Sequence, residues 1–207
     1  MNNSPAQQNR RILVIDDNSA IHEDFKKILN PVSSDKVKLD AFEAEFFGGS
    51  KPSAGTIPFQ IDSAFQGQAG LALVQQAVAA GRPYAMAFID VRMPPGWDGI
   101  ETTAKIWEVD PYLQIVICTA HSDYSWDEMT ARLGVSHRLV IVKKPFDAIE
   151  VLQLTHALTE KWELQQKDRA RMDQLEKMVA ERTRELQLAN EKLKTEMARH
   201  TEAEPAS

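Results

Sequence analysis

The sequence has little cysteine, no long apolar run and no excess of basic residues. Its one cysteine, Cys118, cannot form a disulfide within the chain, so a reducing, cytoplasmic setting is the default expectation. No segment approaches the run of roughly 18 or more apolar residues that spans a membrane. Met1–Arg10 lacks the apolar stretch of a signal peptide. We therefore expect a soluble protein with no membrane partner.

The net charge of the chain bears on which classes of partner it can bind. The chain has 207 residues, a net charge of −6 and a sequence pI near 5.4. Nucleic acids and anionic membranes attract basic surfaces, so direct binding to nucleic acid is not expected. The string Gly48–Lys51 lacks the G-x-x-x-x-G-K-[ST] spacing of a phosphate loop, and we interpret it as part of a solvated connector.

Short apolar runs alternate with segments of helical periodicity along most of the chain. The runs predict strands over 11–15, 59–65, 84–91, 114–120 and 138–143. The periodic segments predict helices over 19–29, with Ser19 as the cap, and over 70–80, 98–109 and 123–134. Nearly continuous apolar strands separated by helices are typical of a parallel sheet that is covered on both faces.

Two regions depart from this alternation. Residues 31–58 are too long for an ordinary strand-to-helix connection, so we interpret them as an insertion that carries an extra helix over 38–47. Residues 147–199 contain neither glycine nor proline, which predicts a long C-terminal helix. A single helix of that length would extend about 80 Å at about 1.5 Å per residue, so its far half needs another partner. The tails 1–9 and 201–207 are expected to be disordered.

Apolar residues recur every seven positions in the far half of this helix. Lys161, Gln165 and Asp168 interrupt the pattern, which predicts a joint between a core-packed helix and a coiled coil over 161–200. Arg182 and Glu196 occupy seam positions, where they weaken the pairing or fix its register. We expect a homodimer, the alternative being an isolated charged helix that frays. The apolar seam residues are Met172, Leu175, Val179, Leu186 and Leu193.

Acidic residues stand at the ends of two predicted strands. Asp16 and Asp17 follow the first strand and Asp90 lies at the end of the third. Ligands of open parallel sheets bind beyond the carboxyl ends of the strands, where the strand order reverses. If these strands are neighbours, the carboxylates converge, and two charges about 4 Å apart repel by roughly 4 kcal/mol at an effective dielectric of about 20. Such a cluster favours a hard cation, Mg²⁺.

The remaining strand ends supply a hydroxyl and an ammonium group. Thr119 ends the fourth strand, and Lys143 and Lys144 end the fifth. Carboxylates, Mg²⁺, a hydroxyl and an ammonium around one point are the groups that neutralise and position a phosphoryl group. An aspartate can itself be the nucleophile and form an acyl phosphate. Each of these residues taken alone is more often an ordinary loop or surface residue.

Together, "VIDDN", "FIDVRMP" followed by "DG", "ICTA" and "KKPF" resemble the motifs of a bacterial two-component response-regulator receiver domain, over about residues 10–160. The resemblance implies a flavodoxin-like, doubly wound α/β fold, a five-stranded parallel sheet with strand order 2-1-3-4-5. It also implies that Asp90 accepts a phosphoryl group from a histidine kinase or phosphotransfer protein. Asp17, Asp90 and the backbone carbonyl of Arg92 would bind Mg²⁺ directly, and Asp16 would bind it through a water.

The same resemblance assigns further roles at the ends of the last two strands. Thr119 would hydrogen-bond the phosphoryl group, and Lys144 would form an ion pair with it. The peptide bond between Lys144 and Pro145 would be cis. Ile141 occupies the position at which the family has its switch aromatic. With an aliphatic side chain there, the rotation of an aromatic ring that the family uses is not expected to apply directly.

The coil resembles signalling helices that join receivers to histidine-kinase or cyclic-nucleotide-cyclase output domains. The chain is then a truncated or a stand-alone regulator, with no enzymatic activity beyond its own phosphorylation and dephosphorylation. One alternative is a Mg²⁺-dependent phosphohydrolase with an aspartate nucleophile, although Arg92 stands where its second acid is expected. Another is a coiled-coil adaptor that works without phosphorylation. His22, His137 and His200 have no neighbours that suggest a metal site.

Overall fold

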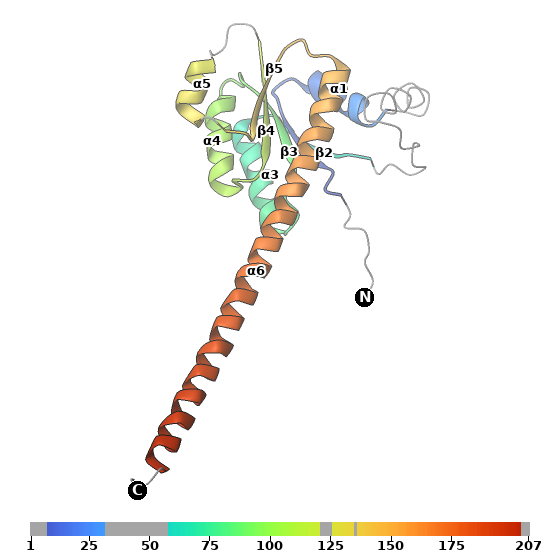
Figure 1. The fold of residues 1–207 in the computed structure, drawn as a ribbon. Helices are drawn as coiled ribbons and strands as arrows, with labels where there is room; N and C mark the ends of the chain where they lie inside the picture. The colour runs from blue at the N-terminus through green and yellow to red at the C-terminus, as the bar shows by residue number, and fades with distance from the viewer. Residues whose placement is uncertain (1–7, 32–57, 121–125, 135, 204–207) are drawn as a thin grey trace. The chain divides into compact units, whose positions relative to one another are not determined.

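The chain folds around a five-stranded parallel sheet (Figure 1). The computed structural model describes residues 8–31, 58–120, 126–134 and 136–203. The sheet has the order β2-β1-β3-β4-β5, which confirms the predicted fold and strand order. The insertion helix predicted over 38–47 lies outside the described residues. The strands are β1 (Arg11–Ile15), β2 (Gln60–Ala64), β3 (Met86–Asp90), β4 (Gln114–Thr119) and β5 (Leu139–Lys143).

Both faces of the sheet are buried, which explains why the strands are apolar nearly throughout. Alternate residues of a strand point to opposite faces. Leu13 and Ile15 of β1 therefore enter one hydrophobic cluster, while Ile12 and Val14 enter the other. The central strands β1, β3 and β4 each contribute residues to both clusters, and this continuous core fixes where the strand ends lie.

Helices supply the two layers over the sheet. Phe25 of α1 and Val151 of α6 pack in the cluster with Ile12, on one face. Helices α3 and α4 pack in the cluster with Leu13, on the other face, and α5 contacts α4. The helices are α1 (Ser19–Leu29), α3 (Gly67–Ala79), α4 (Gly99–Val109), α5 (Trp126–Leu133) and α6 (Ala148–Ala203).

One predicted helix cap and one predicted helix start are wrong. Ser19 is not the cap of α1: Asn18 has an extended backbone and its side chain accepts a hydrogen bond from the Ala20 N–H at 3.0 Å, so Ser19 is the first helical residue. Helix α3 begins at Gly67 instead of residue 70, after an extended Gln66 that makes no side-chain cap. The other end of α3 follows the prediction, because Gly81 has a φ of 65°, the left-handed conformation that glycine adopts readily.

The chain divides into two compact units, Met1–Glu163 and Leu164–Ser207. Helix α6 contributes to both, and it continues to Ala203, three residues into the predicted C-terminal tail. Trp162, which is 9% exposed, is the last buried core residue of α6 within the first unit. Among the described helices, none combines the length and apolar composition needed to cross a membrane.

Candidate functional site

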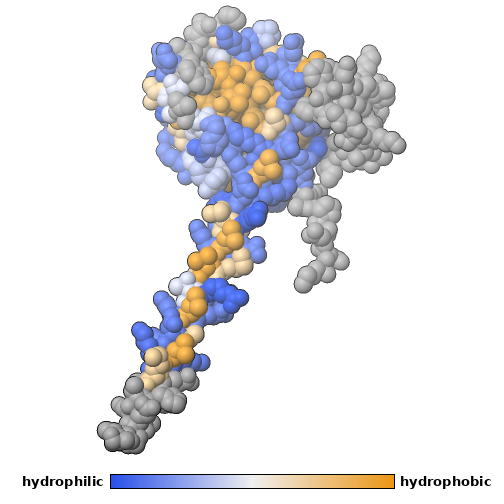
Figure 2. Space-filling model, viewed as in Figure 1, coloured by the Kyte–Doolittle hydropathy of each residue, from blue (hydrophilic) through white to orange (hydrophobic). Residues whose placement is uncertain are grey.

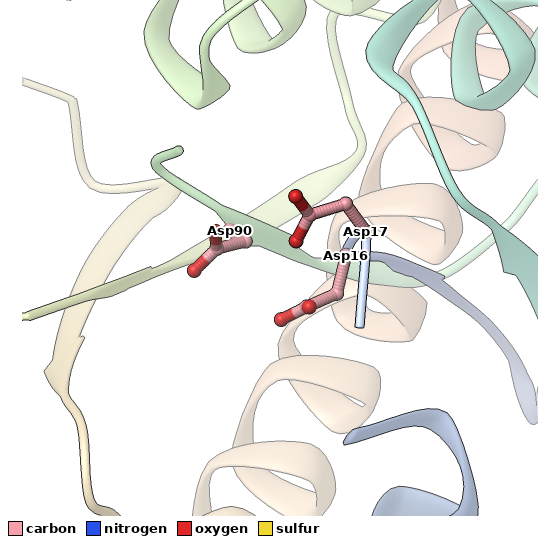
Figure 3. Close-up of side chains that lie close together, drawn as sticks. All are labelled: Asp16, Asp17 and Asp90. Atoms are coloured by element: carbon pink, nitrogen blue, oxygen red, sulfur yellow. The ribbon is translucent and has the colours of Figure 1, made fainter. Parts of the chain in front are cut away.

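Three carboxylates gather at one edge of the sheet (Figure 3). Asp16, Asp17 and Asp90 each offer one oxygen atom, and these atoms lie within 4.8 Å of one another. Asp16 and Asp17 directly follow β1, and Asp90 is the last residue of β3. Since β1 and β3 are adjacent and parallel, with Ile15 opposite Ile89, both strands deliver their acids to the same edge. This edge is where the strand order reverses.

Asp16 is the most buried acid of the group, at 3% exposure. Its backbone N–H donates to the Ala64 carbonyl at 3.1 Å, and its Oδ1 accepts from the Asn18 N–H at 2.9 Å. Asp17 is exposed and Asp90 is partly buried. The group therefore has a fixed, buried side at Asp16 and a solvent-facing side at Asp17.

Lys144, at the end of the edge strand β5, forms ion pairs with two of these acids. Its Nζ lies 2.7 Å from Asp16 Oδ2 and 2.6 Å from Asp90 Oδ1, so one ammonium forms ion pairs with two carboxylates. It directly follows β5, and its peptide bond to Pro145 is cis, as the resemblance implied. Its backbone N–H donates to the Thr119 carbonyl at 2.8 Å, which holds the end of β5 against β4.

Burial and charge shift the acid–base properties of this pair. Burial raises the pKa of Asp90 above its ordinary value, and the nearby Asp16 raises it further, although Lys144 acts in the opposite direction. For Lys144, burial acts to lower the pKa, but hydrogen bonds to Asp16 and Asp90 outweigh it and the pKa is raised. The ionised Asp90 is thus incompletely compensated in the absence of a further cation.

The raised pKa of Asp90 predicts a pH-dependent stability difference. An acid whose pKa is raised on folding contributes stability at low pH and loses it as the pH rises through the folded value. Asp90→Asn, which imitates the protonated acid, should therefore match the wild type below the reference value of 3.8 and be more stable at neutral pH. Urea unfolding in metal-free buffer between acidic and neutral pH measures this. A less stable variant at neutral pH contradicts it.

The loop after β3 is held in place by the start of α4. A Cβ added at Gly99 would lie 2.4 Å from the Asp90 carbonyl oxygen, so a larger residue there would displace the Asp90 backbone. Asp98 caps α4 by accepting a hydrogen bond from the Glu101 N–H at 2.7 Å. This close approach gives a physical reason for the "DG" pair that follows the "FIDVRMP" motif.

The remaining residues that the resemblance assigned to this site are Arg92, Thr119 and Ile141. The Arg92 backbone N–H donates to Asp90 Oδ2 at 3.0 Å, while metal binding by the Arg92 carbonyl stays a prediction. The Thr119 hydroxyl donates to the Ala120 carbonyl at 3.0 Å, so a phosphoryl contact needs a rotation. Ile141 packs at the border of the core, opposite Ile117 of β4.

Sequence reasoning missed one residue of the site, His22. His22 is 2% exposed, and its Nε2 lies 2.8 Å from the Asp16 carbonyl oxygen. A signal was present, because residues 22, 25 and 29 recur on one face of the predicted helix, so His22 shares the buried stripe of Phe25 and Leu29.

The acid group fits a magnesium ion. Its donors are all carboxylate oxygens, the ligands that this hard cation prefers. Opposite ligands of an octahedral Mg²⁺ are about 4.2 Å apart. The three acids, with oxygens within 4.8 Å, therefore fit the cation when one of them binds through a water. Asp17 and Asp90 would bind the cation directly, and Asp16 would bind it through a water.

Comparisons with known proteins agree with this fold. Residues 56–156 match the family model of the response regulator receiver domain. A response regulator receiver domain protein from Methanospirillum hungatei superposes with a TM-score of 0.52 at 19% identity, covering 75% of this chain and 98% of its own. The chain is also similar to the signal receiver domain of an HD domain-containing protein from Pseudomonas fluorescens, with a TM-score of 0.57 at 17% identity, covering 81% and 98%.

A third solved structure, adenylate cyclase from Rhodopirellula baltica, has a TM-score of 0.57 at 17% identity, covering 80% of this chain and 98% of its own. At these identities the likeness concerns the fold alone. No curated protein sequence matches the chain.

Proposed function

Because residues 56–156 match the response regulator receiver domain, we propose that the chain is a phosphorelay protein whose phosphoryl acceptor is Asp90. The donor is a histidine kinase or phosphotransfer protein. The observation that carries this proposal is the convergence of three carboxylates and Lys144 at one edge of the sheet. The chain's own chemistry is limited to gaining and losing this phosphoryl group.

The residues around Asp90 have different roles in phosphoryl transfer. Asp17, Asp90 and the Arg92 carbonyl would bind Mg²⁺ directly, and Asp16 would bind it through a water. The bound ion would neutralise charge on the acids and on the incoming phosphoryl group. Lys144 exchanges its contact with Asp90 Oδ1, now at 2.6 Å, for a phosphoryl oxygen. Thr119, buried at the end of β4, turns its hydroxyl to donate to another phosphoryl oxygen.

The transfer itself is a displacement at phosphorus. A carboxylate oxygen of Asp90 forms a bond to phosphorus while the P–N bond of the partner's phosphohistidine breaks. The imidazole leaves with the electron pair of that bond and takes a proton from solvent. Because Asp90 is only partly buried, a partner can reach it.

We further propose that the second unit pairs with a second copy of the chain. Figure 2 shows apolar side chains along the visible side of the helix. In the single chain Met172, Val179 and Leu186 are 56%, 64% and 63% exposed, although they recur every seven residues. Arg182 forms an ion pair with Glu185 of its own helix at 2.7 Å, which lessens the charge that it brings to the seam. A coiled-coil homodimer would cover this stripe.

A set of contacts at the end of the first unit supports transmission through α6 to an output domain or partner. Lys161 Nζ donates to the His137 carbonyl, next to β5. Trp162 is 9% exposed, and Glu163 Oε1 accepts the Asn9 N–H at 2.9 Å, next to β1. Lys161 and Glu163 of α6 thus contact the segments that precede β5 and β1, so a shift of β5 would strain this end of the helix.

Incubation with acetyl phosphate and Mg²⁺ tests the proposal. Intact mass spectrometry should find one added phosphoryl group on the wild type, none without Mg²⁺ and none on Asp90→Asn. Asp147→Asn, an exposed aspartate beyond β5, is the matched control and should keep the adduct. An unmodified wild type would favour the adaptor alternative, and sustained turnover of a generic phosphate ester would favour the phosphohydrolase.

A further inference from the structure

His22 is a buried polar side chain next to the site. It lies on α1 at 2% exposure, and its Nε2 is 2.8 Å from the Asp16 carbonyl oxygen. A carbonyl oxygen can only accept a hydrogen bond, so Nε2 carries the hydrogen. This bond connects the first turn of α1 with the residue that directly follows β1.

The Asp16 carbonyl is a group that needs such a donor. Asp16 lies beyond the end of β1, and its other polar groups are already engaged, the N–H with Ala64 and the carboxylate with Asn18 and Lys144. A buried carbonyl without a partner is costly, and native structures avoid it. His22 therefore completes the set of contacts that fixes both the backbone and the carboxylate of this acid.

The surroundings of the His22 ring indicate that the role of this side chain is to donate this one hydrogen bond. The Phe65 ring lies against it, with centroids 4.6 Å apart and the planes tilted by 55°. Nδ1 is buried and has no hydrogen-bond partner among the described residues. An apolar side chain of similar size would fill this space equally well, so the Nε2–H donor is what distinguishes histidine at this position.

We propose that His22 is a positioning residue that orients Asp16 for the magnesium site. The inference rests on the proposed function in taking Mg²⁺ as the cation. Residues that orient metal ligands from behind typically change metal affinity about 10- to 100-fold when they are replaced. His22 acts through Asp16, so its loss should weaken Mg²⁺ binding while the receiver stays folded.

A pair of variants separates the donor from the bulk of the side chain. His22→Met removes the donor at similar size and should raise the Mg²⁺ dissociation constant about 10-fold or more. His22→Gln keeps an amide donor at the corresponding distance along the side chain and should stay close to the wild type. Leu29→Ala, 5% exposed and further along α1, controls for loss of packing: it should lower stability without changing the dissociation constant. Isothermal titration with Mg²⁺ gives the constants.

The ring can also be observed directly in metal-free protein. A long-range ¹H–¹⁵N NMR spectrum should show the Nε2–H form of His22. The Nδ1–H form, or equal Mg²⁺ affinity for His22→Met and the wild type, overturns the inference. A wild type that fails to bind Mg²⁺ refutes the proposed metal site instead, and the NMR spectrum then decides on the hydrogen bond to Asp16 alone.

Discussion

Replacing Lys144 with methionine is expected to lower the free energy of unfolding of the receiver unit by about 3 kcal/mol in metal-free buffer, since removing one partner of a buried ion pair leaves the other charges uncompensated. Its ammonium is 2.7 Å from Asp16 and 2.6 Å from Asp90, and the Asp16 side chain is 4% exposed. Without it, the two carboxylates repel each other with no cation between them. Added Mg²⁺ should recover more stability in Lys144→Met than in the wild type.

Lys143→Met is the matched control for this experiment. Lys143 is the exposed neighbour at the end of β5, so its loss removes the same charge from the same region and should change stability by less than about 0.5 kcal/mol. The four tryptophans all lie between residues 97 and 162, so their fluorescence during urea unfolding reports on the receiver unit. Equal stability of both variants in metal-free buffer would show that Lys144 does not compensate the acids.

Replacing Leu186 with glutamate is expected to separate the proposed homodimer into monomers. The substitution removes one leucine from the seam of each helix and brings two carboxylates together there. A loss of roughly 3 kcal/mol would raise the dissociation constant about 100-fold. Sedimentation equilibrium of the full chain measures this constant.

Leu188→Glu controls for composition and net charge. Leu188 is 53% exposed, close to the 63% of Leu186, but it lies outside the predicted seam. It should leave the dimer intact. A monomeric wild type, or equal dissociation constants for the two variants, contradicts the coiled-coil homodimer and supports the isolated-helix alternative.

The sequence was sufficient to predict the fold because the strands of this sheet are buried on both faces. Runs such as Arg11–Ile15 and Met86–Asp90 are apolar with almost no interruption, and such runs separated by helices leave little alternative to a parallel sheet. The strand ends are also predictable, since Asp16 directly follows β1 and Asp90 is the last residue of β3. The gathering of Asp16, Asp17 and Asp90 follows from these strand ends together with the strand order that the family resemblance implies.

What the sequence could not supply were contacts that depend on the exact path of the backbone. The cap of α1 shifted by one residue because Asn18 and Ser19 are both good cap residues, and only the backbone conformation decides between them. The apolar stripe of α1 indicates that His22 is buried, but its hydrogen-bond partner is a backbone carbonyl, which has no sequence signature. Lys144 was expected near the acids, but its double ion pair depends on side-chain geometry.

Locating the phosphoryl group within the protein tests the central claim most directly. After reaction with acetyl phosphate and Mg²⁺, borohydride reduces an aspartyl phosphate to homoserine, which peptide mass mapping can assign to one position. Our account predicts homoserine at position 90 and aspartate unchanged at positions 16 and 17. Homoserine at either of those two neighbours, or at no position in a protein that binds Mg²⁺, would contradict it.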